Sequence, residues 1–182
     1  MLHCDCFSLC VVVDFEQSLR QMIGGERLRI STKCSTSVHI LIMIALLSPQ
    51  EQVTSENLSE SVGRNAVEIR KIFSNLKQAG IIGVSRGKNG TATLLKDPKD
   101  ITLFDIYSAV DAQSLNELIA IHEKPSQQCV VGRNISVLLA EPYAKVSNAV
   151  RQAMSSTTLD DLIQKLYQIE PMMEEILPRN DG

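Results

Sequence analysis

The stretch 54–96, TSENLSESVGRNAVEIRKIFSNLKQAGIIGVSRGKNGTATLLK, decides the predicted fold of this 182-residue chain. Its first half predicts two short amphipathic helices separated by a glycine. Its second half predicts two β-branched runs, 81–85 and 91–95, around a polar, glycine-rich tip. A helix pair followed directly by such a hairpin is typical of a winged helix-turn-helix. We therefore expect a mainly α fold with a small β-hairpin wing.

The two helices of this stretch carry start and stop signals. Thr54 or Ser55 is placed to cap the first helix, and Gly63 is placed to form the turn after it. Asn65 is placed to cap the second helix, and Gly80 to end it. Four apolar residues at helical spacing predict the buried face of the second helix: Ile69, Ile72, Phe73 and Leu76.

The positive charge of the chain is concentrated on this stretch. Seven Lys/Arg against three acidic residues give 54–96 a net charge of about +4. The remainder holds eleven basic and eighteen acidic residues, a net charge of about −7, and the whole chain carries −3. A compact basic motif on an otherwise acidic protein indicates binding to a polyanion. The sequence therefore predicts double-stranded DNA as a partner.

The outward face of the second helix supplies the candidate DNA-reading residues. Arg70 could pair with guanine, Asn65 with adenine, and Glu68 could accept a hydrogen bond from cytosine. Lys71 and Lys77 suit phosphate contacts, which position a protein without reading sequence. The alternative is a small helical domain whose charged face is merely solvated. The full predicted set adds the first helix start, an apolar residue and the hairpin tip: Ser55, Asn65, Val67, Glu68, Arg70, Lys71, Lys77, Arg86 and Lys88.

The chain outside this stretch is predicted to be largely helical. Residues 31–48 are apolar at helical spacing. Thr-x-x-Asp capping boxes at Thr102 and Thr158 predict two further helix starts. A long helical pattern from Asn134 onward presents a broad apolar face. No run of about 18 apolar residues exists, so no membrane-spanning segment is predicted.

Residues 1–27 differ from the rest and hold three of the five cysteines: Cys4, Cys6 and Cys10. We expect either a disordered extension or a start assigned too far upstream, with the native chain beginning at Leu28. A soft metal on these cysteines is the alternative, but no fourth ligand lies nearby, so no metal is predicted. The odd cysteine count argues against a disulfide framework, and no secretory signal is visible. A cytoplasmic protein with reduced thiols is therefore predicted.

Several segments resemble the Rrf-two (Rrf2) family of bacterial transcriptional regulators. These are SVHILIMIALL (37–47), LSESVGRNAVEIRKIFSNLKQAGII (58–82) and SRGKNGTATLLKDPKDITLFDIYSAVD (85–111), followed by CVVGRNI (129–135) and TTLDDLI (157–163). The resemblance covers about residues 28–170. It is strongest to the YwnA-like branch, in which a single cysteine precedes the long helix.

The resemblance implies a homodimer that binds a pseudo-palindromic operator, usually as a repressor. The dimer seam would be the apolar face of the long helix, with Ile135, Leu139, Tyr143, Val146 and Val150. The implied organisation is an N-terminal extension (1–27), a winged helix-turn-helix domain (28–111), a linker or effector segment (112–134), dimerisation helices (135–170) and a tail (171–182).

Two features depart from the family's pattern. The wing has Thr91 after Gly90, where the family usually has a second glycine, and Thr93 replaces an aromatic residue. Cluster-binding members have three cysteines between the DNA-binding domain and the long helix, whereas this chain has only Cys129 there. Because iron–sulfur ligation needs several thiolates, we expect no cluster within one subunit and no other cofactor.

Cys129 could instead be an oxidation-sensitive thiol that acts on the long helix, and the alternative is a small buried apolar residue. A small-molecule effector is another possible signal. Cys34, at the start of the first apolar helix, is expected to pack in the core, and the alternative is a disulfide across the dimer.

Two rival functions belong to other classes. No nucleophile with a matched histidine and acid and no phosphate-cradling loop is visible, so an enzyme is not expected. A dimeric protein-interaction module without specific DNA binding is the other alternative. A DNA binder should lose affinity steeply as salt rises, whereas a hydrophobic interaction module should not.

Overall fold

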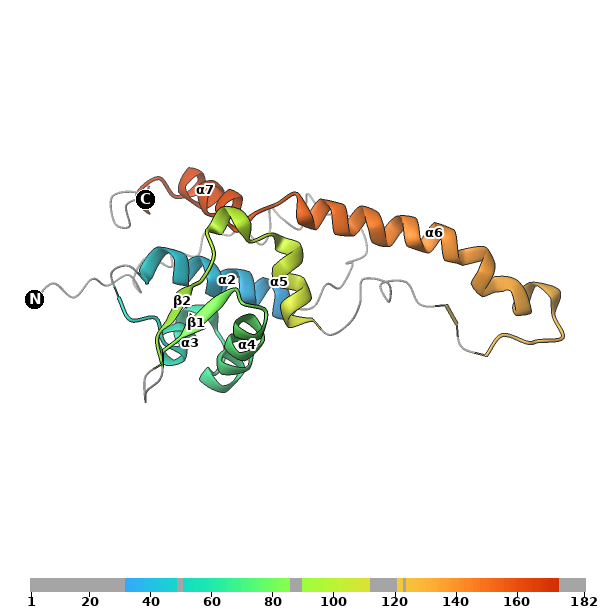
Figure 1. Cartoon of the computed structure of the whole chain (residues 1–182), viewed down its shortest axis with the longest axis horizontal. Helices are drawn as coiled ribbons and strands as arrows, with labels where there is room; N and C mark the ends of the chain where they lie inside the picture. Colours follow the sequence, from blue (N-terminus) through green and yellow to red (C-terminus); the bar gives the residue numbers. More distant parts are fainter. Residues whose placement is uncertain (1–31, 49–50, 86–89, 112–120, 123, 174–182) are drawn as a thin grey trace, which may run out of the picture. The chain divides into compact units, whose positions relative to one another are not determined.

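The computed structural model describes residues 32–48, 51–85, 90–111, 121–122 and 124–173, which all fall within one compact unit of the chain (Figure 1). The elements are α2 (Thr32–Leu47), α3 (Ser55–Val62), α4 (Ala66–Gln78), β1 (Ile82–Val84), β2 (Ala92–Leu94), the 3₁₀ turn η2 (Pro98–Asp100), α5 (Leu103–Val110), α6 (Val130–Ser155) and α7 (Leu159–Ile169). The predicted mainly α fold with a two-stranded hairpin is confirmed. The predictions for residues 1–27, for Arg86 and Lys88, and for most of the tail lie outside the described residues.

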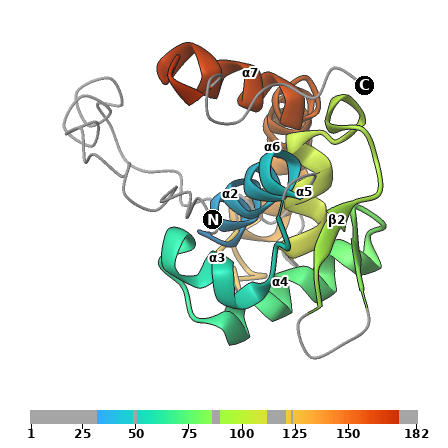
Figure 2. The ribbon, with the colours of Figure 1, turned by 90° about the vertical axis from the view of Figure 1, so that its left-hand side faces the viewer.

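Helix α2 lies at the centre of the core. It packs against α3, α5, α7 and β2, which surround it in the view of Figure 2. Ile40, Leu41 and Ile44 are completely buried, because they share the inward face of the helix. The helix therefore provides the surface on which the helix-turn-helix is mounted.

Cys34, in the first turn of α2, belongs to a smaller cluster with Tyr107 and Met154. Its side chain is buried, which confirms the prediction that it packs in the core. Burial, and to a smaller extent the charge of Asp111, raise the pKa of the Cys34 thiol above its usual value. Since the thiolate is the reactive form, Cys34 is a poor nucleophile.

The turns around α3 and α4 follow the sequence signals. Thr54, rather than Ser55, caps α3: its hydroxyl oxygen accepts the backbone N–H of Asn57 at 3.2 Å. Gly63 ends α3 with a φ of 63°, a left-handed conformation that favours glycine. Asn65 caps α4 as predicted. The predicted stripe on α4 is confirmed, because all four of its residues are buried: Ile69, Ile72, Phe73 and Leu76.

The hairpin pairs β1 and β2 in antiparallel register, with Ile82 opposite Leu94 and Val84 opposite Ala92. Both predicted strand regions are thus confirmed over their central three residues. The backbone N–H of Ala92 also donates to the carbonyl of Val53 at 2.8 Å. This bond ties the wing to the residue that leads into α3.

Helices α5 and α7 begin side by side. Thr102 and Thr158 cap them, each within a complete capping box with Asp105 or Asp161, as the sequence predicts. The two threonines face each other in an isolated antiparallel bridge. The backbone N–H of Leu103 donates to the Thr157 carbonyl, and the backbone N–H of Leu159 donates to the Ile101 carbonyl. Both hydrogen bonds are 2.8 Å long. Helix α7 then completes the main core with Leu159, Ile163 and Tyr167.

Helix α6 begins at Val130, so the predicted start of the helical pattern near Asn134 is corrected: residues 130–134 are helical. The reason is the cap, because the Cys129 sulfur accepts the backbone N–H of Gly132 at 3.4 Å. Cysteine is not among the residues that usually signal a helix start, so the sequence pattern missed it. Among the described residues, no helix is both long and apolar enough to cross a membrane.

Candidate nucleic-acid interface

The exposed face of α4 is the centre of the candidate interface. Burial of the apolar stripe turns the polar positions of the helix away from the core. Asn65, Glu68, Arg70 and Lys71 are all exposed, and the side chain of Val67 is 54% exposed. The structure thus brings five of the predicted DNA-reading residues onto one short helix.

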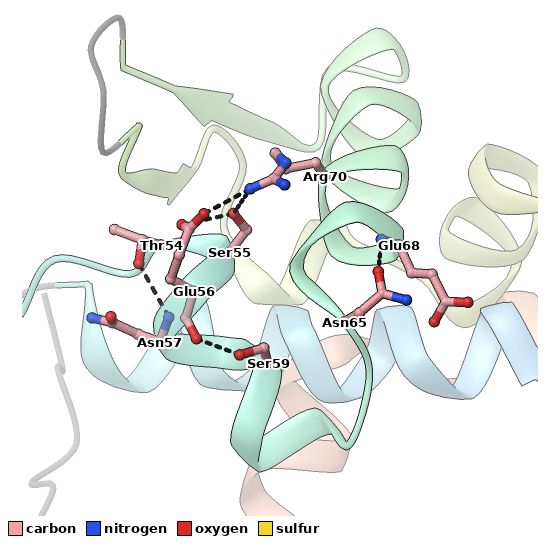
Figure 3. A network of polar contacts seen from close by, with 8 residues as sticks. All are labelled: Thr54, Ser55, Glu56, Asn57, Ser59, Asn65, Glu68 and Arg70. Atoms are coloured by element: carbon pink, nitrogen blue, oxygen red, sulfur yellow. Dashed lines mark hydrogen bonds and ion pairs between the residues drawn. The ribbon is translucent and has the colours of Figure 1, made fainter.

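The capping of α4 by Asn65 competes with the role in base reading that was predicted for it from the sequence. Its side-chain carbonyl oxygen accepts the backbone N–H of Glu68 at 2.9 Å and so caps α4 (Figure 3). A bidentate contact with adenine needs both the oxygen and the amide nitrogen of an asparagine. Because the oxygen is already used by the helix, the Asn65 amide nitrogen is suited to donating a single hydrogen bond.

Arg70 is held by the start of α3. Its Nη1 lies 2.6 Å from Oε1 of Glu56 and donates a longer bond of 3.3 Å to the Ser55 hydroxyl (Figure 3). The Ser55 hydroxyl in turn donates to Oε2 of Glu56 at 2.8 Å. Ser55 is buried, so this predicted DNA-binding residue is placed to support Arg70 with its side chain.

Glu56 is the member of this group that the sequence analysis missed. The Ser55 hydroxyl, the backbone N–H of Glu56 and the Arg70 guanidinium all stabilise its charged form and hold the pKa of this carboxyl below its usual value. Glu56 and Arg70 are fourteen positions apart on different helices, so no local spacing rule links them. The packing of α3 on α4 brings these two residues together.

Lys71 and Lys77 provide positive charge on α4. Both are exposed, and neither forms an ion pair with a residue that the structure describes. Lys77 lies in the last turn, where the negative end of the helix dipole also stabilises a cation. These positions suit contacts with phosphates, as predicted from the sequence.

The base of the wing is closed just before the tip. The backbone N–H of Ser85 donates to the Thr91 carbonyl at 3.0 Å, and the Ser85 hydroxyl accepts the Thr91 N–H at 2.9 Å. Gly90 lies so close to this pair that a Cβ atom there would stand 2.9 Å from the Ser85 carbonyl oxygen. Gly90 is therefore needed for the close approach of the two strands.

The start of α6 carries the predicted thiol. Cys129 is exposed rather than buried, and its sulfur faces the first N–H groups of the helix. Gly132 permits a tight turn there, because a Cβ atom at this position would lie 2.6 Å from the Ser126 carbonyl oxygen.

The remaining length of α6 exposes apolar side chains. Val137 and Leu138 are 76% and 61% exposed. Of the predicted seam, Val146 is exposed, whereas Ile135, Leu139, Tyr143 and Val150 are partly buried within the single chain. By helical periodicity Val137 lies on the side of α6 opposite Leu139, so the exposed apolar surface of this helix is not confined to the predicted seam.

The residues that the structure describes offer no multidentate metal site. No group of three or more His, Cys, Asp or Glu side chains is close enough to hold an ion within these ranges. The two described cysteines, Cys34 and Cys129, belong to different parts of the fold.

Comparisons with known proteins match this chain to transcriptional regulators. A family model described as "Rrf2: Iron-dependent Transcriptional regulator" matches residues 30–165. YwnA of Bacillus subtilis (strain 168), a predicted HTH-type transcriptional regulator, is 37% identical over 138 residues, which cover 76% of this chain and 99% of YwnA.

Solved structures share the fold. CymR, the global cysteine regulator of B. subtilis, superposes with a TM-score of 0.57 at 22% identity, over 76% of this chain and 98% of CymR. IscR of T. potens gives a TM-score of 0.58 at 18% identity, over 78% of this chain and 90% of IscR.

Proposed function

Because the chain belongs to the Rrf2 family of transcriptional regulators, we propose that it represses transcription as a homodimer bound to a pseudo-palindromic operator. Members of this family are DNA-binding regulators and not enzymes, so double-stranded DNA is the partner of this chain. The homodimer, the repressor role and the signal are the proposed parts. A cytoplasmic location is proposed with them, because the DNA target lies there.

One observation carries the DNA-reading role: α4 presents polar and basic residues on its exposed face while four apolar residues fix it to the core. A helix-turn-helix reads the major groove with the N-terminal residues of its second helix. Asn65, Val67, Glu68, Arg70 and Lys71 are exposed within the first two turns of α4. Base contacts from Arg70 and phosphate contacts from Lys71 and Lys77 are therefore proposed.

The homodimer proposal is supported by α6. Val146 of the predicted seam is exposed and its other four residues are only partly buried within one chain, so a twofold seam would remove their remaining apolar surface from water. The proposed seam is formed by Ile135, Leu139, Tyr143, Val146 and Val150. Two α4 helices would then meet successive major-groove faces of a palindromic site.

We expect Leu139→Glu to dissociate the dimer, because it would bury two unpaired carboxylates in the seam. Light scattering should give the dimer mass for wild type and the monomer mass for the variant, with the dimer dissociation constant raised at least ~100-fold. Gln152→Glu is the matched control, since Gln152 is exposed and lies on the opposite side of α6. A monomeric wild type, or a dimeric Leu139→Glu variant, would contradict the proposed seam.

We also propose that oxidation of Cys129 modulates DNA binding. The thiol is exposed, and its sulfur caps the helix that carries the proposed seam. A peroxide that oxidises the thiol to a sulfenic acid, and is itself reduced to water or an alcohol, would change the acceptor at the start of α6 and so alter how the two subunits are held. A small-molecule effector is the alternative signal.

A gel shift with the DNA upstream of the protein's own gene tests both parts. Reduced wild type should bind this DNA in the presence of unrelated competitor and should change its affinity on mild oxidation, whereas Cys129→Ser should bind and ignore oxidation. An equal response of Cys129→Ser would exclude the thiol, and absence of specific binding in either state would favour the protein-interaction module. Falling affinity with rising salt would confirm phosphate contacts.

We further propose that one subunit holds no iron–sulfur cluster, although the matching family model is described as iron-dependent. The support is that Cys129 alone lies between the DNA-binding domain and the long helix, while Cys34, the other cysteine of the described residues, is buried against α5. A single thiolate does not hold a cluster. Stoichiometric iron and sulfide in anaerobically purified protein would overturn this.

A further inference from the structure

Glu56, Ser55 and Arg70 form a closed triangle of hydrogen bonds. Oε1 of Glu56 accepts from Arg70 Nη1 at 2.6 Å, and Oε2 accepts from the Ser55 hydroxyl at 2.8 Å. The Ser55 oxygen also accepts from Nη1 at 3.3 Å. Ser55 is buried, so the triangle is anchored in the fold at one corner.

The triangle uses only one end of the guanidinium. The bonds that Arg70 makes to described residues all leave from Nη1. An arginine carries five N–H donors in a fixed planar fork, so the edge formed by Nε and Nη2 retains its donors. Two parallel donors are what a bidentate contact with guanine O6 and N7 requires.

The exposure of the group also matters. The Arg70 and Glu56 side chains are 53% and 60% exposed, and an exposed ion pair contributes little to the stability of a fold. A contact that limits the rotation of a long side chain instead reduces the entropy that the side chain loses on binding. The bond between Glu56 and Arg70 is therefore expected to contribute more to DNA affinity than to the stability of the fold.

We propose that Glu56 is a positioning residue: together with Ser55 it aims the free edge of Arg70 at a base and so sets sequence discrimination without touching DNA. The inference rests on the proposed function and adds a residue to its reading site. It differs from a latch, in which Glu56 would compete with DNA for Arg70. The two roles predict opposite effects when the carboxylate is removed.

The test compares the full-length wild type with Glu56→Ala, Arg70→Ala and the double variant. Affinity is measured for the operator, for operators substituted at each base pair, and for unrelated DNA of equal length, at one salt concentration. Loss of a negative charge alone raises affinity for all DNA, so the ratio of operator to unrelated affinity is the readout. Glu56→Ala is expected to lower this ratio roughly tenfold, with the loss concentrated at the base pair that Arg70→Ala also relaxes.

Glu60→Ala is the matched control, because it removes the same charge one helical turn later on α3 and Glu60 makes no bond to Arg70. Its ratio should equal that of wild type. In the Arg70→Ala background, Glu56→Ala should have no further effect on the ratio. A ratio that Glu56→Ala leaves unchanged or raises, or lowers equally without Arg70, would overturn the proposal. If the wild type prefers the operator to unrelated DNA, such a result overturns only the positioning role of Glu56. A wild type without this preference would overturn the proposed function as well.

Discussion

Replacing Ile69 with alanine is expected to lower the free energy of unfolding by about 2–5 kcal/mol. Ile69 is completely buried in the main core, where it fixes the side of α4 that faces inward. Truncation removes apolar packing and leaves a cavity that the surrounding helices can fill only in part. Urea unfolding at one fixed protein concentration measures the loss, since the stability of a dimer depends on concentration.

Val67→Ala provides the control for this experiment. Val67 lies two positions earlier on the same helix, but its side chain is 54% exposed. Its truncation should change the free energy of unfolding by no more than about 0.5 kcal/mol. Equal effects of the two substitutions would mean that the inward face of α4 has been assigned wrongly.

Replacing Arg70 with alanine is expected to weaken operator binding by about 1–3 kcal/mol for each arginine, and so by twice that amount in the proposed homodimer. The loss should be accompanied by relaxed preference at one base pair of each half-site. The reason is that α3 holds the Arg70 guanidinium in place, and an arginine so held can donate two hydrogen bonds to one guanine. Titrations against a series of singly substituted operators provide the measurement.

Lys71→Ala is the comparison that separates base reading from charge. Lys71 is the next residue on α4, is exposed and has no ion pair within the described residues. Its removal should weaken binding to every DNA sequence alike and reduce the salt slope by about 1 for each phosphate that is no longer neutralised. If Arg70→Ala behaves in the same way, Arg70 binds a phosphate and does not read a base.

The sequence was sufficient to predict the helix-turn-helix in detail because its signals are local. The cap at Asn65, the glycine at position 63 and the apolar stripe on α4 act within one or two turns of the chain, and all are present in the structure. The two capping boxes at Thr102 and Thr158 succeeded for the same reason.

The parts that the sequence did not reveal depend on tertiary contacts or on unusual chemistry. The bond between Glu56 and Arg70 spans two helices and has no periodic pattern. The sequence predicted Asn65 both as a cap and as a base reader, but not that capping occupies the oxygen that a bidentate contact with adenine needs. Helix α6 began earlier than expected because a sulfur atom replaced the usual oxygen at its cap.

The bridge between Thr102 and Thr158 makes α6 an insertion in topological terms. The chain leaves the core at α5 and returns to the same point, where hydrogen bonds of 2.8 Å join the two helix starts, before α7 fills the core with Leu159 and Ile163. A truncation after α6 would therefore remove core side chains along with the C-terminus. The segment that the bridge encloses also begins with α5, whose Ile106 and Val110 lie in the main core, and ends with Met154 of α6 packed against Tyr107. Only the middle of α6 can therefore change in length or sequence without loss of core packing.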